Sequence, residues 1–123
     1  STFILRWAVA IILIMHSVPV MFNNGVNDFG TLYLNQVGFN PLGVPLAWAI
    51  KLSHVAAAIC LILEKYIRWA AIVTILILIS GIAMIHFKEG WFVVGNGRNG
   101  MEFNFLLVAA LLTIMFSDVK KSA

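Results

Sequence analysis

Five ionisable residues lie inside long apolar stretches of this sequence or at their edges: His16, Lys51, His54, His86 and Glu102. An ionisable side chain is costly to place in an apolar segment, so each of the five is a candidate for binding or chemistry. Lys51 and His54 are three residues apart and therefore share one face of a helix. These residue types predict a polar cluster that can hold a ligand.

Several ligands fit such a cluster to different degrees. Imidazole and carboxylate groups bind many metals, and His16 with His54 could hold a haem, but no histidine pair has the i, i+4 spacing that preorganises metal ligands. A quinone needs only an apolar slot, hydrogen-bond donors and a group that exchanges protons. His16, Lys51 and His54 supply donors, while His86 or Glu102 can exchange protons with water. We therefore predict a quinone or other polar ligand, no metal site and no catalytic residue.

The structural alternative is that these side chains have no ligand. Long polar side chains near helix ends reach the membrane surface while their stems stay in lipid. His86 and Glu102 lie close enough to the predicted helix ends for this interpretation, and Lys51 is long enough to extend outward.

Composition identifies the solvent of the chain. Of its 123 residues 62% are hydrophobic and 11% charged, with a mean hydropathy of +0.99, whereas soluble domains are about 45–50% apolar and about 25% charged. This excludes an ordinary soluble domain, a disordered chain and a nucleic-acid-binding protein. The single cysteine, Cys60, excludes an intrachain disulfide. We predict an integral membrane protein with lipid as its main partner and no nucleic-acid partner.

Four apolar stretches must position the candidate residues. They predict helices at about residues 2–22, 44–63, 67–87 and 101–117, each near the length of about 20 residues that spans a bilayer. They are predicted as helices because an open strand in lipid would leave its backbone unpaired. The fold class is therefore all-α, an integral membrane four-helix up-down-up-down bundle forming one domain over residues 1–123. Residues 23–43, rich in Asn and Gly, and 88–100 are predicted as the two long connections.

Positive charge predicts the orientation of this bundle. The side with both termini and the short connection carries five basic residues, and the side with the long connections carries three. The first set is Arg6, Lys65, Arg68, Lys120 and Lys121, and the second is Lys51, Lys88 and Arg98. Because basic residues mark the cytoplasmic side, both termini are predicted to be cytoplasmic. The five candidate residues then lie in the periplasmic half of the membrane.

A series of short motifs resembles the DoxX family of small four-helix bacterial membrane proteins. The motifs are, in order, Arg6 followed by His16, then Arg68-Trp69-Ala70-Ala71, Ala83-Met84-Ile85-His86-Phe87, Gly90-Trp91-Phe92, Asn96-Gly97, Gly100 and Glu102. The resemblance extends over nearly the whole chain and is strongest over residues 68–112. Two places depart from the family pattern: His16-Ser17 lacks a following lysine, and Lys51-Leu52-Ser53-His54 replaces a Gly-rich acidic stretch. His86 and Glu102 are therefore the positions to which the family pattern carries over.

The resemblance implies a membrane subunit linked to redox systems, since the family is named after an archaeal thiosulfate:quinone oxidoreductase. We expect a multi-pass protein of the bacterial inner membrane that is not an enzyme on its own. It is expected to be an accessory subunit of a respiratory or quinone-linked complex, with other membrane subunits as partners and a quinone or lipid pocket in its periplasmic half. The alternatives are a subunit that itself transfers electrons with quinone and a purely structural, lipid-organising protein.

Overall fold

The computed structural model describes residues 2–86, 90, 91 and 101–122, and the side chains of these except 85, 86 and 118–122. The described residues form helices and no strand, which confirms the all-α prediction. In chain order the helices are α1 (Phe3–Met21), α2 (Gly25–Asp28), η1 (Phe29–Phe39), α3 (Gly43–Leu63), α4 (Ile67–Gly81), η2 (Ile82–His86) and α5 (Glu102–Ser122). The two η segments are wider, π-helical turns.

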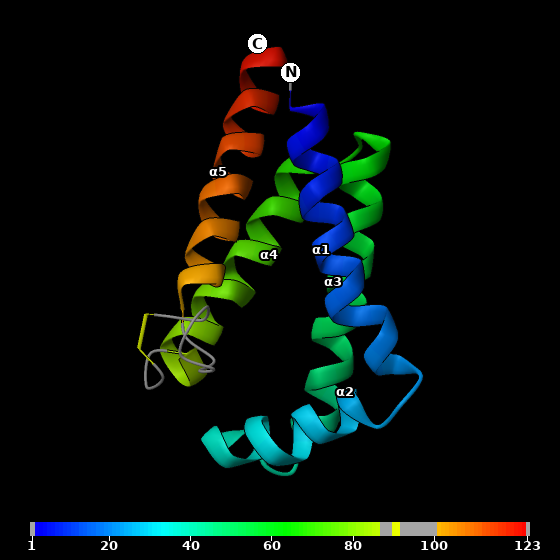
Figure 1. The fold of residues 1–123 in the computed structure, drawn as a ribbon, viewed down its shortest axis with the longest axis vertical. Helices are drawn as coiled ribbons and strands as arrows, with labels where there is room; N and C mark the ends of the chain where they lie inside the picture. The colour runs from blue at the N-terminus through cyan, green and yellow to red at the C-terminus, as the bar shows by residue number, and fades with distance from the viewer. Residues whose placement is uncertain (1, 87–89, 92–100, 123) are drawn as a thin grey trace.

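The four long helices form a ring in which neighbours run in opposite directions (Figure 1). Helix α1 packs against α3, α3 against α4, α4 against α5, and α5 against α1. The start of α1 and the end of α5 lie at the same end of the bundle (Figure 1). This is the predicted up-down-up-down arrangement.

Three of the described helical stretches are long and apolar enough to cross a membrane: Phe3–Met21, Gly43–Leu63 and Ile67–Met84. In α5 the apolar part is the shorter stretch Glu102–Ser117. All four long helices begin within one residue of the predicted starts. Helix α5 continues to residue 122, beyond the predicted end at 117, because the charged residues after Ser117 end the apolar stretch without breaking a helix.

Residues 25–39, which the sequence predicted as part of a long connection, are helical apart from a kink at Gly38, whose φ is +114°. This crossing segment, α2 and η1, lies across the end of the bundle opposite the termini (Figure 1). It is fixed to α3 by two asparagines: Asn35 Oδ1 accepts from the Gly43 N–H at 2.9 Å, and Asn27 Oδ1 accepts from Trp48 Nε1 at 2.9 Å. The asparagines that indicated a loop therefore hold a helical segment against its neighbour.

A glycine is required where the crossing segment meets α3. A Cβ atom on Gly30 would lie 2.5 Å from Val44 Cα, which is too close for any real contact. Gly30 is itself buried, and Val26 and Leu34 on the same segment are buried with Ala47 of α3 in a small apolar cluster. The crossing segment is thus packed onto α3 backbone to backbone at this point.

At the opposite end of the bundle, Arg6 joins α1 to the end of α3. Its side chain is 6% exposed, and its Nη1 donates to the Leu61 carbonyl oxygen at 2.7 Å. Carbonyls in the last turn of a helix lack an intrahelical partner, so Arg6 fills the role of a cap. The exposed carboxylate of Glu64 lies 3.9 Å from Arg6 Nη2. Arg6, which the sequence analysis counted among the basic residues of the inner side, is therefore a buried structural contact.

Candidate functional site

A cavity of about 830 Å³ lies between the helices at the end covered by the crossing segment. All four long helices and η1 contribute to its lining. Most lining residues are apolar, among them Leu13, Leu76, Met84 and Phe103. Six lining residues carry polar side chains: His16, Tyr33, Lys51, His54, Ser80 and Asn104.

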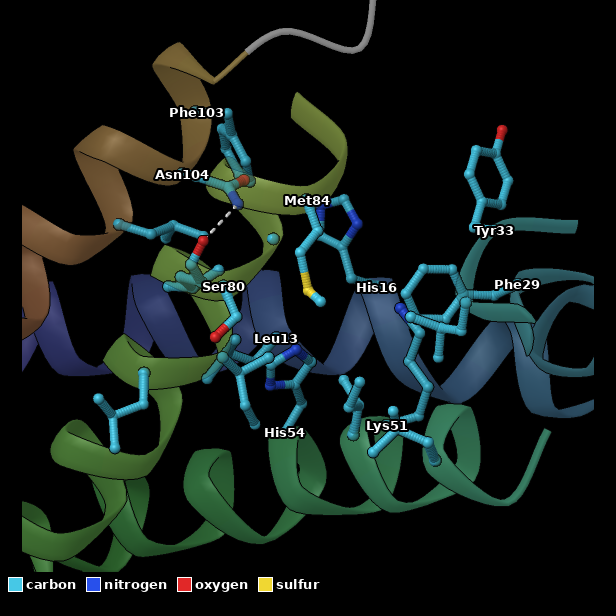
Figure 2. Close-up of a pocket in the computed structure, with 18 of the residues that line it drawn as sticks. Leu13, His16, Phe29, Tyr33, Lys51, His54, Ser80, Met84, Phe103 and Asn104 are labelled. Atoms are coloured by element: carbon cyan, nitrogen blue, oxygen red, sulfur yellow. Dashed lines mark hydrogen bonds between the residues drawn. The ribbon is translucent and has the colours of Figure 1, made fainter. Parts of the chain in front are cut away.

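The structure brings three of the five predicted site residues together in this cavity. His16 comes from α1, and Lys51 and His54 come from one face of α3 (Figure 2). Glu102 is the first residue of α5 and does not line the cavity. The side chain of His86, in η2, lies outside the described residues. The binding role of these residues stays a prediction.

His54 is the most deeply buried ionisable side chain of the cavity. It is 7% exposed, and its Nδ1 atom has no hydrogen-bond partner among the residues that the structure describes. Figure 2 shows the ring among the cavity side chains, on the α3 side. A buried polar atom without a partner is unfavourable by about 1–3 kcal/mol. A ligand in the cavity that forms a hydrogen bond with His54 Nδ1 would therefore be stabilised by that contact.

Aromatic rings lie beside Lys51 and His16, two other polar residues of the cavity. Lys51 Nζ is 5.2 Å from the centroid of the Phe29 ring, within the range of a cation–π contact. The His16 ring lies 5.6 Å from the Phe103 ring, tilted by 45°. None of the lining residues in the described part of the chain is acidic. The cavity thus combines flat apolar surfaces with hydrogen-bond donors and no carboxylate.

Three polar lining residues were missed by the sequence analysis. Asn104 is 8% exposed, and its Nδ2 atom donates to the Leu78 carbonyl oxygen at 3.2 Å. Ser80 of α4 and Tyr33 of η1 line the same cavity. The sequence does carry a signal for Asn104, which is an uncharged amide between two phenylalanines near the start of an apolar helix.

The arrangement offers little to a metal ion. Within the described residues no three His, Cys, Asp or Glu side chains lie close enough to one another to form a metal site. It suits an organic ligand better, since drug-sized and cofactor pockets have volumes of about 300–1,000 Å³, apolar walls and a few polar groups that fix orientation. The cavity lining from α4 and α5 is apolar except for Ser80 and Asn104.

Comparison with known proteins identifies the family. The sequence model of the DoxX family matches residues 1–87. This segment runs from α1 into η2 and carries His16, Lys51, His54 and His86, whereas Asn104 and Glu102 lie beyond it. No curated protein and no solved structure matches the chain at a significant level. Because the match covers more than half of the chain, and its helices are of membrane-spanning length, the chain is a multi-pass membrane protein of the DoxX family.

Proposed function

We propose that this DoxX protein is an accessory subunit of a redox complex in the bacterial inner membrane, and that its cavity binds the ring of a quinone. The observation that carries the proposal is the buried His54 Nδ1, without a partner among the described residues, in a largely apolar cavity. Both termini are proposed to be cytoplasmic, which places the cavity in the periplasmic half of the membrane.

The chemistry of a quinone matches that of the cavity. Its ring is flat and apolar and carries two carbonyl oxygens, which accept hydrogen bonds. Lys51 and His54 offer donors from one face of α3, and the Phe29 and Phe103 rings offer flat apolar surfaces. The isoprenoid tail of a quinone would extend from the cavity into lipid, the solvent that suits the exposed apolar faces of these helices.

The proposed role is binding and positioning, in concert with catalytic subunits. The groups that line the cavity are suited to hold a ligand, and the proposal assigns the redox chemistry to the other subunits of the complex. A quinone-reactive subunit that itself takes part in electron transfer is the alternative within the same class.

Gentle purification from native membranes tests the proposal. We expect mass spectrometry to find membrane redox subunits with the chain, and solvent extraction to recover quinone in near-stoichiometric amount. The variant His54→Leu should keep its partner subunits and lose the quinone. Lys65→Met, an exposed change in the short connection between α3 and α4, is the matched control and should retain both.

Two outcomes would contradict the proposal. If the functional chain is recovered with neither quinone nor other subunits, the interpretation that remains is a structural, lipid-organising protein. Recovery of a phospholipid in place of quinone, lost in His54→Leu, would make the cavity a lipid site. The orientation is tested separately: in a Cys60→Ser background, Gln36→Cys on the crossing segment should react with an impermeant maleimide added outside, and Lys65→Cys should not.

A further inference from the structure

Lys51 lies on a face of α3 that is turned into the bundle. Its neighbours on this face, one turn before and one turn after it, are Ala47 and His54, which are 0% and 7% exposed. Lys51 itself is half-buried and lines the cavity. Its side chain therefore extends into the bundle, away from the exposed faces of the helix.

The crossing segment covers the ammonium group on the side of the nearer end of the bundle. Lys51 is eight residues after Gly43, the first residue of α3, which places it about 12 Å along the helix. Between these two positions, Ala47 packs against Val26 of the crossing segment. The Phe29 ring of the same segment lies 5.2 Å from Lys51 Nζ (Figure 2). A lysine that reached the membrane surface would extend past this ring, and the ammonium group lies against it.

The positive charge of Lys51 has no negative partner in the described part of the chain. No lining residue described is acidic, and Lys51 makes no ion pair with a described residue. Asp28, next to Phe29, is exposed and lies outside the lining. His16 and His54 are neutral or positive and cannot balance a cation. Charged side chains within membrane segments pair with an opposite charge in the protein or in a ligand, so the cavity is suited to a ligand that carries a negative charge.

We infer that the cavity binds an acidic quinone, a ring with an ionised hydroxyl group, and that Lys51 is the residue that selects this charge. The inference rests on the proposed quinone-binding function. A neutral quinone can accept a hydrogen bond from Lys51 but leaves its charge uncompensated. An ionised ring oxygen accepts the same hydrogen bond and adds the attraction of two opposite charges, which is strong in a largely apolar cavity. The selection requires a single contact, between the ammonium group and the ionised oxygen.

Binding of three related ligands to the wild-type protein in phosphatidylcholine nanodiscs tests this inference. The ligands are a decyl-tailed hydroxynaphthoquinone, which is ionised at neutral pH, its methyl ether, and the matching methylnaphthoquinone, and the last two are neutral. Titration calorimetry measures their affinities, with empty nanodiscs as the background. We expect the ionised ring to bind about tenfold more tightly than either neutral ring, since loss of hydration offsets part of the attraction between the charges.

Two variants assign the preference to the charge of Lys51. In Lys51→Met the ionised ring should bind no more tightly than its ether, because the side chain keeps its length and loses its charge. Lys51→Arg keeps the charge and should keep the preference. A purely structural role of Lys51 would instead weaken the binding of all three ligands equally. Lys65→Met, an exposed change in the connection between α3 and α4, is the matched control and should leave all three affinities unaltered.

The outcomes separate this inference from the proposed function. Equal binding of the three rings by the wild type would overturn the selection of charge and leave quinone binding standing, whereas binding of none would overturn both. A preference that survives in Lys51→Met would overturn the role of Lys51. Native mass spectrometry identifies the source of the anion: phosphatidylglycerol retained in place of the ionised ring, and lost in Lys51→Met, would make it a lipid headgroup. If Lys51→Met fails to assemble, the ligand series on the wild type still decides whether the cavity selects an anion.

Discussion

Arg6, at the end of the bundle with the termini, and His54, in the cavity, are both buried polar side chains, but they differ in whether their polar atoms have partners. At the end with the termini, Arg6 of α1 donates to the Leu61 carbonyl of α3 at 2.7 Å. In the cavity, His54 at the middle of α3 is as deeply buried as Arg6 but has an Nδ1 atom with no partner among the described residues. Arg6 is therefore a structural contact, whereas the Nδ1 atom of His54 is available to bind a ligand.

The difference indicates that, in this small membrane bundle, some buried polar residues stabilise the fold and others bind a ligand. Lipid provides no hydrogen bonds, so a polar group in a membrane helix must find a partner in the protein, in water or in a ligand. Arg6 has found its partner in the backbone and fixes how α1 meets α3. His54 gains a partner only if something enters the cavity. Replacing Arg6 and replacing His54 by an apolar residue should therefore change stability in opposite directions.

The largest effect is expected for Arg6→Leu. The substitution removes the partner of the Leu61 carbonyl at a buried position and should lower the free energy of unfolding by about 3 kcal/mol. Equilibrium unfolding in mixed detergent–SDS micelles, followed by far-UV circular dichroism, measures this change. Arg68→Leu is the matched control, since Arg68 is an exposed arginine at the start of α4.

A loss of stability in Arg68→Leu equal to that in Arg6→Leu would contradict this interpretation. Most of the effect should come from the carbonyl contact, because the Arg6–Glu64 pair is 3.9 Å apart and its carboxylate is exposed. Glu64→Gln should therefore change stability by less than about 1 kcal/mol.

The second largest effect is expected for Gly30→Ala, at the cavity end. The added Cβ would lie 2.5 Å from Val44 Cα, so the crossing segment must move away from α3, at a cost of about 2 kcal/mol. Hydrogen–deuterium exchange should increase over residues 25–39 while the four long helices stay protected. Gln36→Ala, an exposed change in η1, should leave exchange unaltered. Unchanged protection in Gly30→Ala would show that the close contact is not required.

A smaller effect of opposite sign is expected for His54→Leu. Replacing a buried imidazole that lacks a partner by an apolar side chain should raise the free energy of unfolding by about 1 kcal/mol while abolishing quinone binding. The unfolding assay used for Arg6→Leu measures the first change and solvent extraction the second. Ser53→Ala, on the same helix and outside the cavity lining, should change neither. Destabilisation comparable to that of Arg6→Leu would make His54 a structural residue and remove the contrast between the two ends.

The sequence predicted those parts of the fold that depend on local hydropathy. The four long helices begin where the apolar stretches begin, and the connection of three residues at 64–66 forced α3 and α4 to be antiparallel neighbours. The helical crossing segment could not be predicted, because Asn and Gly favour loops. Its conformation depends on contacts with α3 that are remote in sequence, at Gly30 and Trp48.

The same reasoning explains which site residues were found. His16, Lys51 and His54 could be predicted to lie at a similar depth in the membrane, because depth follows from the number of residues between each of them and the end of its helix. The structure places all three in the cavity lining. Glu102 was predicted in the same half of the membrane, but it is the first residue of α5 and does not line the cavity. Which residues of α5 line the cavity depends on the rotation of α5 about its own axis, and the sequence does not give that rotation. Asn104 was missed because it is neutral, although an amide in an apolar helix also requires a partner.

The smallest effect is expected for Lys51→Met. This substitution distinguishes the cation–π contact of Lys51 from the backbone packing of Gly30, the two contacts that join the crossing segment to α3. The substitution removes the cation over the Phe29 ring, a contact of about 0.5–1 kcal/mol at a partly exposed site, but keeps an unbranched side chain of similar length. Exchange over residues 25–39 should rise far less than in Gly30→Ala, since the backbone contact and both asparagine bonds remain. Lys65→Met is the control at the other end. An increase as large as that in Gly30→Ala would mean that Lys51, rather than backbone packing, holds the crossing segment over the cavity.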